Sequence, residues 1–431
     1  MKIKEIKALE ILDSRGNPTI ETIVILEDGS QGSAMVPSGA STGSYEAVEL
    51  RDGGKEYMGL GVQNAITNVE NKIAKIVVGM DAIDQEKIDN AMIDLDGTEN
   101  KANLGANAIL SVSLAVARAQ AKSEGKDLYE YLAKFNPDFD GTYFMPLPMM
   151  NIMNGGKHAN WATDVQEYMV MPIGAKNIEE AVRMCAEIYQ SLKKVLKSKK
   201  YGTSVGDEGG FAPLVQSNEE PFILMSEAIE KTGLKLGTDI VFAIDAAATE
   251  FFAEGAYQLN KEGVKLNSKE MGDFYMNLAK KYPVVSVEDG FAEDDWTGFE
   301  NFYKMENDKI QVVGDDLYVT NIKRLEKGIN EKTSNSILIK LNQIGTLTET
   351  IQAVLMARKN NMTAIISHRS GETEDAFIAD LSVAMGTGQI KTGAPCRSER
   401  TAKYNRLIKI EKFATAKTEL AKFPFKGVCI Q

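Results

Sequence analysis

Six short apolar runs in the second half of the chain each end on a residue that can ionise. In Ser336–Lys340, three apolar residues precede a lysine, and the turn residues Asn342 and Gly345 follow. Such a run is too short for a helix, and its β-branched residues favour a buried strand. One lysine at the end of one strand usually only reaches solvent, so the repetition is the informative feature. The runs are Ile240–Asp245, Val284–Glu288, Gln311–Asp315, Ser336–Lys340, Ala364–His368 and Thr387–Lys391.

The spacing of these runs predicts alternating strands and helices. From one run end to the next, the last five ends lie 27, 25, 28 and 23 residues apart, which is the length of one strand, one helix and two short loops. Thr346 and Glu349 form a capping box that starts one helix, and a second helix is expected from about Asp375 to Met385, ended by Gly386. Alternation predicts a parallel sheet, and continuously apolar strands predict cover on both faces. A (β/α) barrel meets both conditions.

In such a barrel, functional side chains gather at the C-terminal ends of the strands. The run ends would then face one cavity, with three carboxylates opposite two amines and an imidazole: Asp245, Glu288, Asp315, Lys340, Lys391 and His368. The carboxylates form an all-oxygen site without cysteine, which suits a hard cation such as Mg²⁺ better than Zn²⁺.

This residue set indicates proton removal next to a carboxylate. A lysine can act as a base only when neutral, and its reference pKa near ~10.4 keeps it charged in water. A bound cation and Lys391 would lower the pKa of Lys340 and make it a credible proton acceptor, while the metal stabilises an enolate. Glu208 and Glu167 are the available acids, because repulsion among clustered carboxylates favours a proton on one of them.

Composition restricts the class of protein. The 431 residues, of which 43% are hydrophobic, suffice for a large core and suit two domains. A net charge of −12 argues against nucleic acid or an anionic membrane as the main partner. Three cysteines without metal-site spacing predict free thiols in a reducing compartment. No stretch is long enough to cross a membrane and no secretory signal is recognisable, so a cytoplasmic location is expected.

The first third of the chain differs from the rest. Alternating strands form a hairpin around Asp28 and Gly29, and helical stretches follow at 62–78 and 106–121, which predicts an α+β lobe. Turn-forming residues cluster at 135–141. We therefore predict two domains, residues 1–138 and residues 139–431, with the first barrel strand near Pro148–Met153.

Three glycine-rich loops could approach a ligand closely. The loop Pro37–Ser44 lacks the lysine of a phosphate-binding P-loop, so its composition alone favours an ordinary turn. The stretch Gly206–Gly210 places Asp207 and Glu208 between glycines, which fits a solvated turn and a site equally well. The loop Asn154–His158 carries one of the two histidines and leads to Gln166 and Glu167.

Long motifs make the chain resemble the enolase family along nearly its whole length. The motifs are Asp13–Pro18, Pro37–Gly43, Gly206–Pro213, Gly314–Leu317, Ser367–Asp375 and Gly388–Gly393. The resemblance implies a small N-terminal α+β domain followed by a variant (β/α)8 barrel whose second strand is antiparallel. It also implies the reversible dehydration of 2-phosphoglycerate to phosphoenolpyruvate. Sites of this superfamily are the known example of a lysine or histidine base that works with Mg²⁺ on an enediolate.

The resemblance also assigns roles to individual residues. It implies a structural Mg²⁺ held by Asp245, Glu288 and Asp315, and a catalytic Mg²⁺ placed with the help of Ser41 and its mobile loop. Lys340 would be the base and Glu208 the acid, with Glu167 beside it. Lys391 would meet the substrate carboxylate, and Arg369, whose planar fork suits phosphate, would bind that group with Ser370. The pocket would be completed by His158, Gln166 and His368.

Some alternatives stay open. The loop around His158 departs from the family pattern at Lys157 and at Asn160–Thr163, which leaves the closure of this loop undetermined. Another superfamily dehydratase is disfavoured, because such enzymes place a Lys-x-Lys pair where this chain has Asp207 and Glu208. A protein whose main role is binding, at the cell surface or in RNA processing, is disfavoured by the acidic pI and by a sequence end without lysine. The resemblance further implies a homodimer or an octamer built from dimers.

Overall fold

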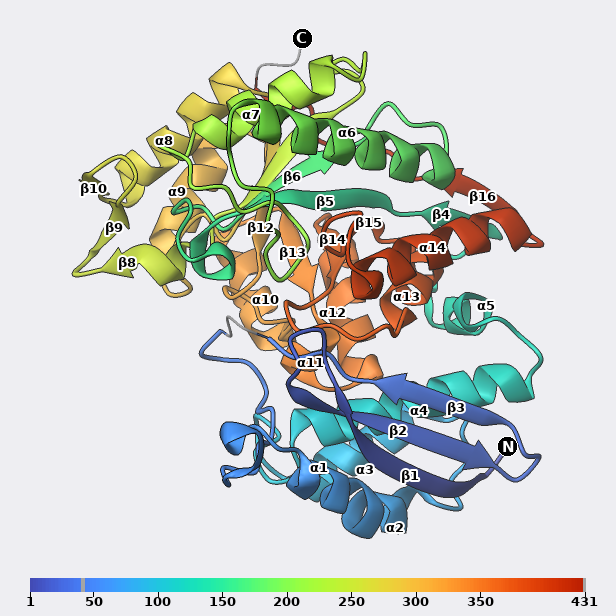
Figure 1. Ribbon diagram of the computed structural model, residues 1–431. Coiled ribbons are helices and arrows are strands. Elements are labelled where there is room, and N and C mark those ends of the chain that lie inside the picture. Colours follow the sequence, from blue (N-terminus) through green and yellow to red (C-terminus); the bar gives the residue numbers. More distant parts are fainter. Residues whose placement is uncertain (40–42, 429–431) are drawn as a thin grey trace.

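The computed structural model describes residues 1–39 and 43–428. In this part of the chain, a small three-stranded sheet with helices lies below a closed eight-stranded barrel surrounded by helices (Figure 1). The N-terminus lies in the small lower part, and the last described residues lie at the far side of the barrel. The predicted order, a small α+β domain followed by a barrel, is confirmed.

The N-terminal part is a strand meander packed on a helix. Its strands β1 (Ile3–Leu12), β2 (Pro18–Leu26) and β3 (Gln31–Met35) are antiparallel neighbours in that order. The helix α4 (Ala106–Ser123) lies so close to β3 that a Cβ on Gly32 would be 2.2 Å from the backbone nitrogen of Ala119. The other elements are η1 (Glu56–Gly59), α1 (Gln63–Asn68), the π-helical η2 (Val69–Ile73), α2 (Ala74–Val77), α3 (Gln85–Asp96), α5 (Leu128–Leu132) and η3 (Ala133–Phe135).

All six predicted runs are barrel strands, and their bounds agree with the prediction to within one residue. Neighbouring barrel strands are parallel, except that β6 is antiparallel to both β5 and β7. The second barrel strand is therefore reversed, as the resemblance implied. The strands are β5 (Leu147–Asn154), β6 (Glu167–Met171), β7 (Val241–Asp245), β11 (Val284–Glu288), β12 (Gln311–Gly314), β13 (Ser336–Ile339), β14 (Thr363–Ser367) and β15 (Gly388–Lys391).

The helices around the barrel begin and end where local chemistry requires it. Before α12 (Leu347–Lys359), the Thr346 hydroxyl accepts a hydrogen bond from the backbone N–H of Glu349 at 3.1 Å. After α13 (Phe377–Met385), Gly386 takes a left-handed φ of 57°, which a side chain would disfavour. The remaining helices are α6 (Ile178–Ser198), α7 (Glu220–Glu230), α8 (Ser268–Lys281), α9 (Trp296–Glu306), α10 (Ile322–Glu331), α11 (Leu341–Ile344), α14 (Ser398–Phe413), η4 (Gly156–Ala159) and η5 (Ala248–Phe251).

Two small strand groups were not predicted. A hairpin-like sheet, β8 (Phe252–Ala253), β9 (Ala256–Leu259) and β10 (Val264–Leu266), projects from the barrel after β7. The strands β4 (Thr142–Met145) and β16 (Lys417–Leu420) pair in parallel and join the start of the barrel part to its end. Between η3 and β4, residues 136–141 form neither helix nor strand. We propose the domain boundary at residues 138 and 139, inside this stretch.

The barrel interior explains how the strand ends become a site. Because side chains alternate along a strand, residues two positions beyond a core residue point to the same interior. Val313 and Leu338 belong to this interior cluster, and Asp315 and Lys340 follow them by two positions. The cluster consists of Leu147, Met149, Met169, Met171, Val241, Ala243, Val285, Val313, Leu338 and Ile365. Asp315 and Lys340 therefore lie on top of an apolar floor.

The two parts of the molecule are joined by buried polar contacts. Arg118 of α4 forms an ion pair with Asp375, with Nη1 2.6 Å from Oδ2. Lys101 forms an ion pair with Glu349 at 3.0 Å.

Among the described residues, every helix is too short or too polar to cross a membrane.

We predict that Asp89, at this junction, makes stability depend on pH. Its carboxylate accepts hydrogen bonds from the backbone N–H and hydroxyl of Thr348 at 3.0 and 2.6 Å, yet burial outweighs them and raises its pKa to about 6. The usual pKa is 3.8, so the folded protein holds an extra proton between about pH 4 and pH 6. The free energy of unfolding should fall as pH rises through this window, by up to about 3 kcal/mol.

Urea unfolding of the wild type and of Asp89→Asn between about pH 4 and pH 7 measures this effect. The free energy of unfolding of the variant should not decrease in this way. Relative to the wild type, the variant should therefore become more stable as the pH rises. Asp94→Asn, the same change at an exposed position of α3, is the matched control. Parallel pH dependences of Asp89→Asn and the wild type would contradict the prediction.

Candidate active site

A small pocket lined almost entirely by polar side chains opens at the C-terminal ends of the parallel barrel strands. Most of the predicted site residues line it, although they come from distant parts of the sequence. They are His158, Gln166, Glu167, Glu208, Asp245, Asp315, Lys340, His368, Arg369, Ser370 and Lys391. Glu288 is fully buried and in contact with Lys391. Ser41, the remaining predicted residue, lies outside the described residues.

Lys391 joins three carboxylates below the pocket. Its Nζ lies 2.7 Å from Glu288, 3.0 Å from Asp245 and 3.2 Å from Glu167, and all four side chains are buried. Burial opposes the ammonium form, but the carboxylates outweigh burial and raise the pKa of Lys391. Burial and the Asp245 carboxylate raise the pKa of Glu288. One positive charge does not balance three carboxylates, so this group can accept a further cation.

Lys340 is paired with Asp315. Its ammonium contacts one carboxylate oxygen of Asp315, and Gln343 donates a hydrogen bond to the other at 2.8 Å. Burial lowers the pKa of Lys340, but Asp315 outweighs burial, so the net shift is upward. Lys340 is thus an ammonium ion in this arrangement. Lys340 can accept a proton only if it first becomes neutral. This requires a second cation near Asp315, because such a cation would weaken the attraction between Asp315 and the ammonium group.

Three carboxylates fit a hard cation at this end of the barrel. Asp245, Glu288 and Asp315 stand on or directly after the adjacent strands β7, β11 and β12. The Oε2 atom of Glu288 is buried and has no hydrogen-bond partner in the part of the chain that the structure describes. An oxygen-only donor set of net negative charge suits Mg²⁺. These residues could therefore hold the metal that the sequence predicts.

Two aspartates that the sequence reasoning missed support this group. Asp289 accepts hydrogen bonds from the backbone N–H groups of Asp315 and Asp316, each at 2.8 Å, and so fixes the end of β12. Oxygen atoms of Asp289, Asp315 and Asp316 lie within 4.8 Å of one another. Both missed residues directly follow predicted ones in the sequence, which was the available signal.

On the other side of the pocket, two glutamates lie next to the histidines. Asn151 donates a hydrogen bond to Glu208 at 2.9 Å, and the nearest nitrogens of His158 and His368 lie 3.6 and 3.5 Å from the other oxygen of Glu208. Burial and the Glu208 carboxylate raise the pKa of Glu167 well above its usual range. Burial also acts to raise the pKa of Glu208, but the positive charges around it, among them Arg400 and Lys391, outweigh burial and lower this pKa. The proton of the pair therefore lies on Glu167.

The reversed strand places Glu167 at the pocket. Glu167 is the first residue of β6 and lies opposite Asp245, the last residue of β7, in the antiparallel register. Around the closed barrel, three strands lie between β6 and β13 in either direction. Glu167 and Lys340 therefore stand on opposite sides of the pocket.

The N-terminal domain contributes to the site through Glu46. Arg369 donates to both carboxylate oxygens of Glu46, at 2.8 and 3.1 Å, and to the side-chain oxygen of Asn342 at 3.0 Å. Such a bidentate pair fixes the plane of the guanidinium. Nothing in the sequence pattern pointed to Glu46, because it precedes the barrel by about a hundred residues.

The loop around His158 has unusual backbone geometry. Asn160 and Trp161 take left-handed φ values of 48° and 57°, which non-glycine residues seldom adopt. Lys157 forms an exposed ion pair with Glu250 at 3.1 Å, so the residue that departs from the family pattern connects this loop to η5. Both ring nitrogens of His158 are buried without a hydrogen-bond partner among the described residues.

Comparison with protein families covers both parts of the chain. A family model described as the enolase N-terminal domain matches residues 3–132. A second, described as the enolase C-terminal TIM barrel domain, matches residues 142–425. The two matches leave only the irregular stretch before β4 and the two chain ends uncovered.

We predict that Lys391→Met destabilises the protein and makes it depend on a divalent cation. The substitution leaves Glu167, Asp245 and Glu288 without their shared ammonium, and breaking a buried ion pair costs roughly 3–5 kcal/mol. Thermal unfolding in chelator should show the loss. Added Mg²⁺ should stabilise the variant more than the wild type, because the cation would replace the missing charge.

Lys194→Met is the control, since it removes a lysine from the exposed side of α6. It should change neither the unfolding temperature nor the response to Mg²⁺ appreciably. Equal stabilisation of Lys391→Met and the wild type by Mg²⁺ would argue against a cation site among these carboxylates.

Proposed function

The chain belongs to the enolase family, and on this premise we propose that it catalyses the reversible dehydration of 2-phosphoglycerate to phosphoenolpyruvate, the enolase reaction of glycolysis. The observation that carries the proposal is the placement of Lys340 and the Glu167–Glu208 pair on opposite sides of one pocket. An elimination needs a proton acceptor on one face of the substrate and a proton donor at the leaving group on the other.

Lys340 is the proposed base. Its neutral amine takes the proton from the carbon next to the substrate carboxylate, and the C–H electron pair moves into the carboxylate to form an enediolate. The electrons then return to form the carbon–carbon double bond while the C–O bond to the hydroxyl group breaks. Glu208, with Glu167 beside it, supplies the proton that turns the departing hydroxide into water.

The two glutamates can share this task. The raised pKa of Glu167 keeps a proton in the pair, and the lowered pKa of Glu208 makes that residue the one that is ionised before the reaction. Both carboxyl groups and His158 have polar atoms within 4.8 Å of one another. A proton held on Glu167 can therefore reach the leaving hydroxyl through Glu208.

The remaining residues bind and orient the substrate. Lys391 binds the substrate carboxylate, and Arg369 and Ser370 bind the phosphate. The phosphate then competes with Glu46 for the guanidinium of Arg369. The buried atoms of His158, Gln166 and His368 that lack partners among the described residues are then satisfied by the substrate and by bound water.

Two Mg²⁺ ions belong to the proposal. Asp245, Glu288 and Asp315 hold the structural ion, and Ser41 helps to place the catalytic one. Mg²⁺ supplies positive charge that stabilises the negative charge of the enediolate. An ion held there would share the charge of Asp315, which is the main cause of the raised pKa of Lys340, so Lys340 would lose its proton more easily. A cytoplasmic location and an assembly built from dimers complete the proposal.

Another superfamily dehydratase is the remaining alternative. A guanidinium and a hydroxyl side by side at the pocket, from Arg369 and Ser370, favour a phosphorylated substrate over a plain sugar acid. Asp207 and Glu208 also occupy the place of the Lys-x-Lys pair of such enzymes.

We predict that purified protein with Mg²⁺ converts 2-phosphoglycerate to a product with the ultraviolet absorbance of a conjugated enol. Chelation should stop the reaction, and Lys340→Ala should lower kcat by about 10³-fold because the base is lost. Lys359→Ala, at the exposed end of α12, should behave as the wild type. A Lys340→Ala variant with wild-type activity, or folded wild type that is inactive with Mg²⁺, would refute the proposal.

We also predict that glycerate without the phosphate is turned over at least about 10³-fold less efficiently, measured as kcat/KM. The reason is that a substrate without the phosphate would lose its charge-assisted contacts with Arg369 and Ser370. In Arg369→Gln, the preference for the phosphorylated substrate should shrink. Comparable turnover of both substrates by the wild type would instead favour another dehydratase.

A further inference from the structure

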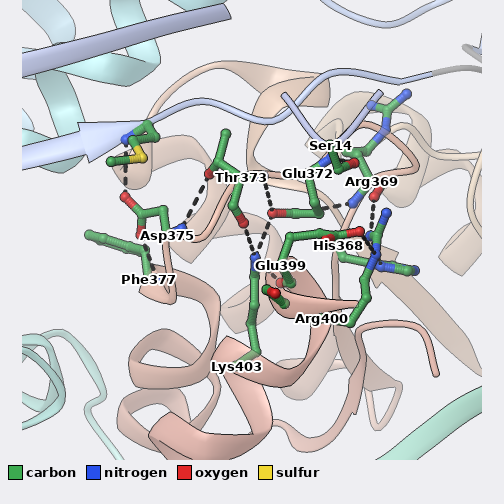
Figure 2. A network of polar contacts seen from close by, with 12 residues as sticks. Ser14, His368, Arg369, Glu372, Thr373, Asp375, Phe377, Glu399, Arg400 and Lys403 are labelled. Carbon is green, nitrogen blue, oxygen red and sulfur yellow. Dashed lines mark hydrogen bonds and ion pairs between the residues drawn. The ribbon is translucent and has the colours of Figure 1, made fainter. Parts of the chain in front are cut away.

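Helix α14 places two buried cations beneath the loop that follows β14. Arg400 and Lys403, one helical turn apart, are both 0% exposed and point into this loop (Figure 2). Lys403 donates to Glu372 at 2.7 Å and to the backbone oxygen of Thr373 at 2.6 Å. Neither cation lines the pocket, and the sequence pattern singled out neither of them.

Arg400 makes contacts with two loops of the site. Its Nη1 lies 2.5 Å from Nδ1 of His368 and 2.6 Å from the backbone oxygen of Arg369. Its Nη2 donates to the backbone oxygens of Ser370 at 2.7 Å and of Asp207 at 3.1 Å. One side chain thus joins the loop with His368, Arg369 and Ser370 to the loop that carries Glu208.

The contact with His368 determines which ring nitrogen holds the proton. A guanidinium has only donors and keeps its charge, so Nδ1 of His368 must be the acceptor. The proton of the neutral imidazole is then on Nε2, which is buried and lies 3.5 Å from Glu208. Burial lowers the pKa of His368 well below its usual range, which keeps the ring neutral.

We propose that Arg400 is a positioning residue that holds His368 as the Nε2–H tautomer and directs this N–H at Glu208. The inference rests on the proposed function and adds a residue to it. Glu208 is a carboxylate before the reaction and again after it has passed a proton to the leaving hydroxide, and in both states the Nε2–H group can donate to it. The opposite tautomer would turn a lone pair toward that carboxylate and repel it.

Lys403 supports the loop that follows β14 without contacting the ring of His368. Its three acceptors are Glu372 and the backbone oxygens of Thr373 and Glu399, and none of them is His368. The loop therefore has a buried cation for support besides Arg400. The contact between Arg400 and the imidazole adds control of the proton position.

The tautomer can be measured directly, because the chain contains only two histidines. Full-length protein with ¹⁵N-labelled histidine should show two sets of ring signals in NMR spectra, and a His158→Gln sample assigns them. For His368 we expect an unprotonated Nδ1 and a protonated Nε2 from about pH 5 to pH 8, without titration. A protonated Nδ1 or an imidazolium in the wild type would overturn the inference.

Variants of Arg400 then test its importance for the reaction. Arg400→Met removes the donor to Nδ1, so the His368 signals should show a mixture of tautomers, and kcat for 2-phosphoglycerate should fall by about 10²-fold. KM should change by less than about threefold, because Arg400 does not touch the substrate. Arg400→Lys keeps a donor to Nδ1 and should recover part of kcat. If the methionine variant does not fold, the lysine variant is used for the test in its place.

Arg406→Lys is the matched control, since Arg406 of α14 pairs with Asp380 away from His368. It should leave the tautomer and kcat unchanged. If the Arg400 variants change the tautomer but not kcat, the positioning role is refuted. If the wild type has the expected tautomer but no activity toward 2-phosphoglycerate, the proposed function has failed. The NMR spectra distinguish this case from a wrong tautomer of His368.

Discussion

The shared ammonium of Lys391 is the interaction on which the site depends. Three carboxyl groups buried in one place would repel one another and pay a large desolvation cost, and a partner of opposite charge offsets both effects. Lys391 extends from β15 and contacts Glu167, Asp245 and Glu288, which belong to β6, β7 and β11. The lysine therefore connects strands across the barrel opening, and it holds the carboxylates close enough to bind a cation.

The surroundings of these charges come from outside the strands. Glu46 of the N-terminal domain holds the guanidinium of Arg369, and α14 supplies Arg400 and Lys403 beneath the same loop. A loop whose backbone oxygens accept hydrogen bonds from two buried cations has little freedom to move. The barrel supplies most of the residues that line the pocket, and its neighbours hold several of them in place.

The reversed direction of β6 has a chemical consequence. In a fully parallel barrel, the first residue of the second strand would lie at the opposite end of the barrel, far from the other strand ends. Because β6 is antiparallel, Glu167 is level with Asp245 and stands across the pocket from Lys340. The placement of the two glutamates opposite Lys340 thus follows from the direction of one strand, and the proposed reaction uses this placement.

The sequence by itself determined six of the eight barrel strands to within one residue, because apolar runs with regular spacing can be buried only as strands separated by helices. It also identified the residues at the strand ends, because functional side chains gather at the C-terminal ends of barrel strands. The direction of β6 came from the family resemblance and not from the pattern. Only the tertiary structure showed the contacts of Glu46, Asn151 and Arg400 with the site. Their importance comes from distances to residues far away in the chain, and neither periodicity nor local propensity encodes such distances.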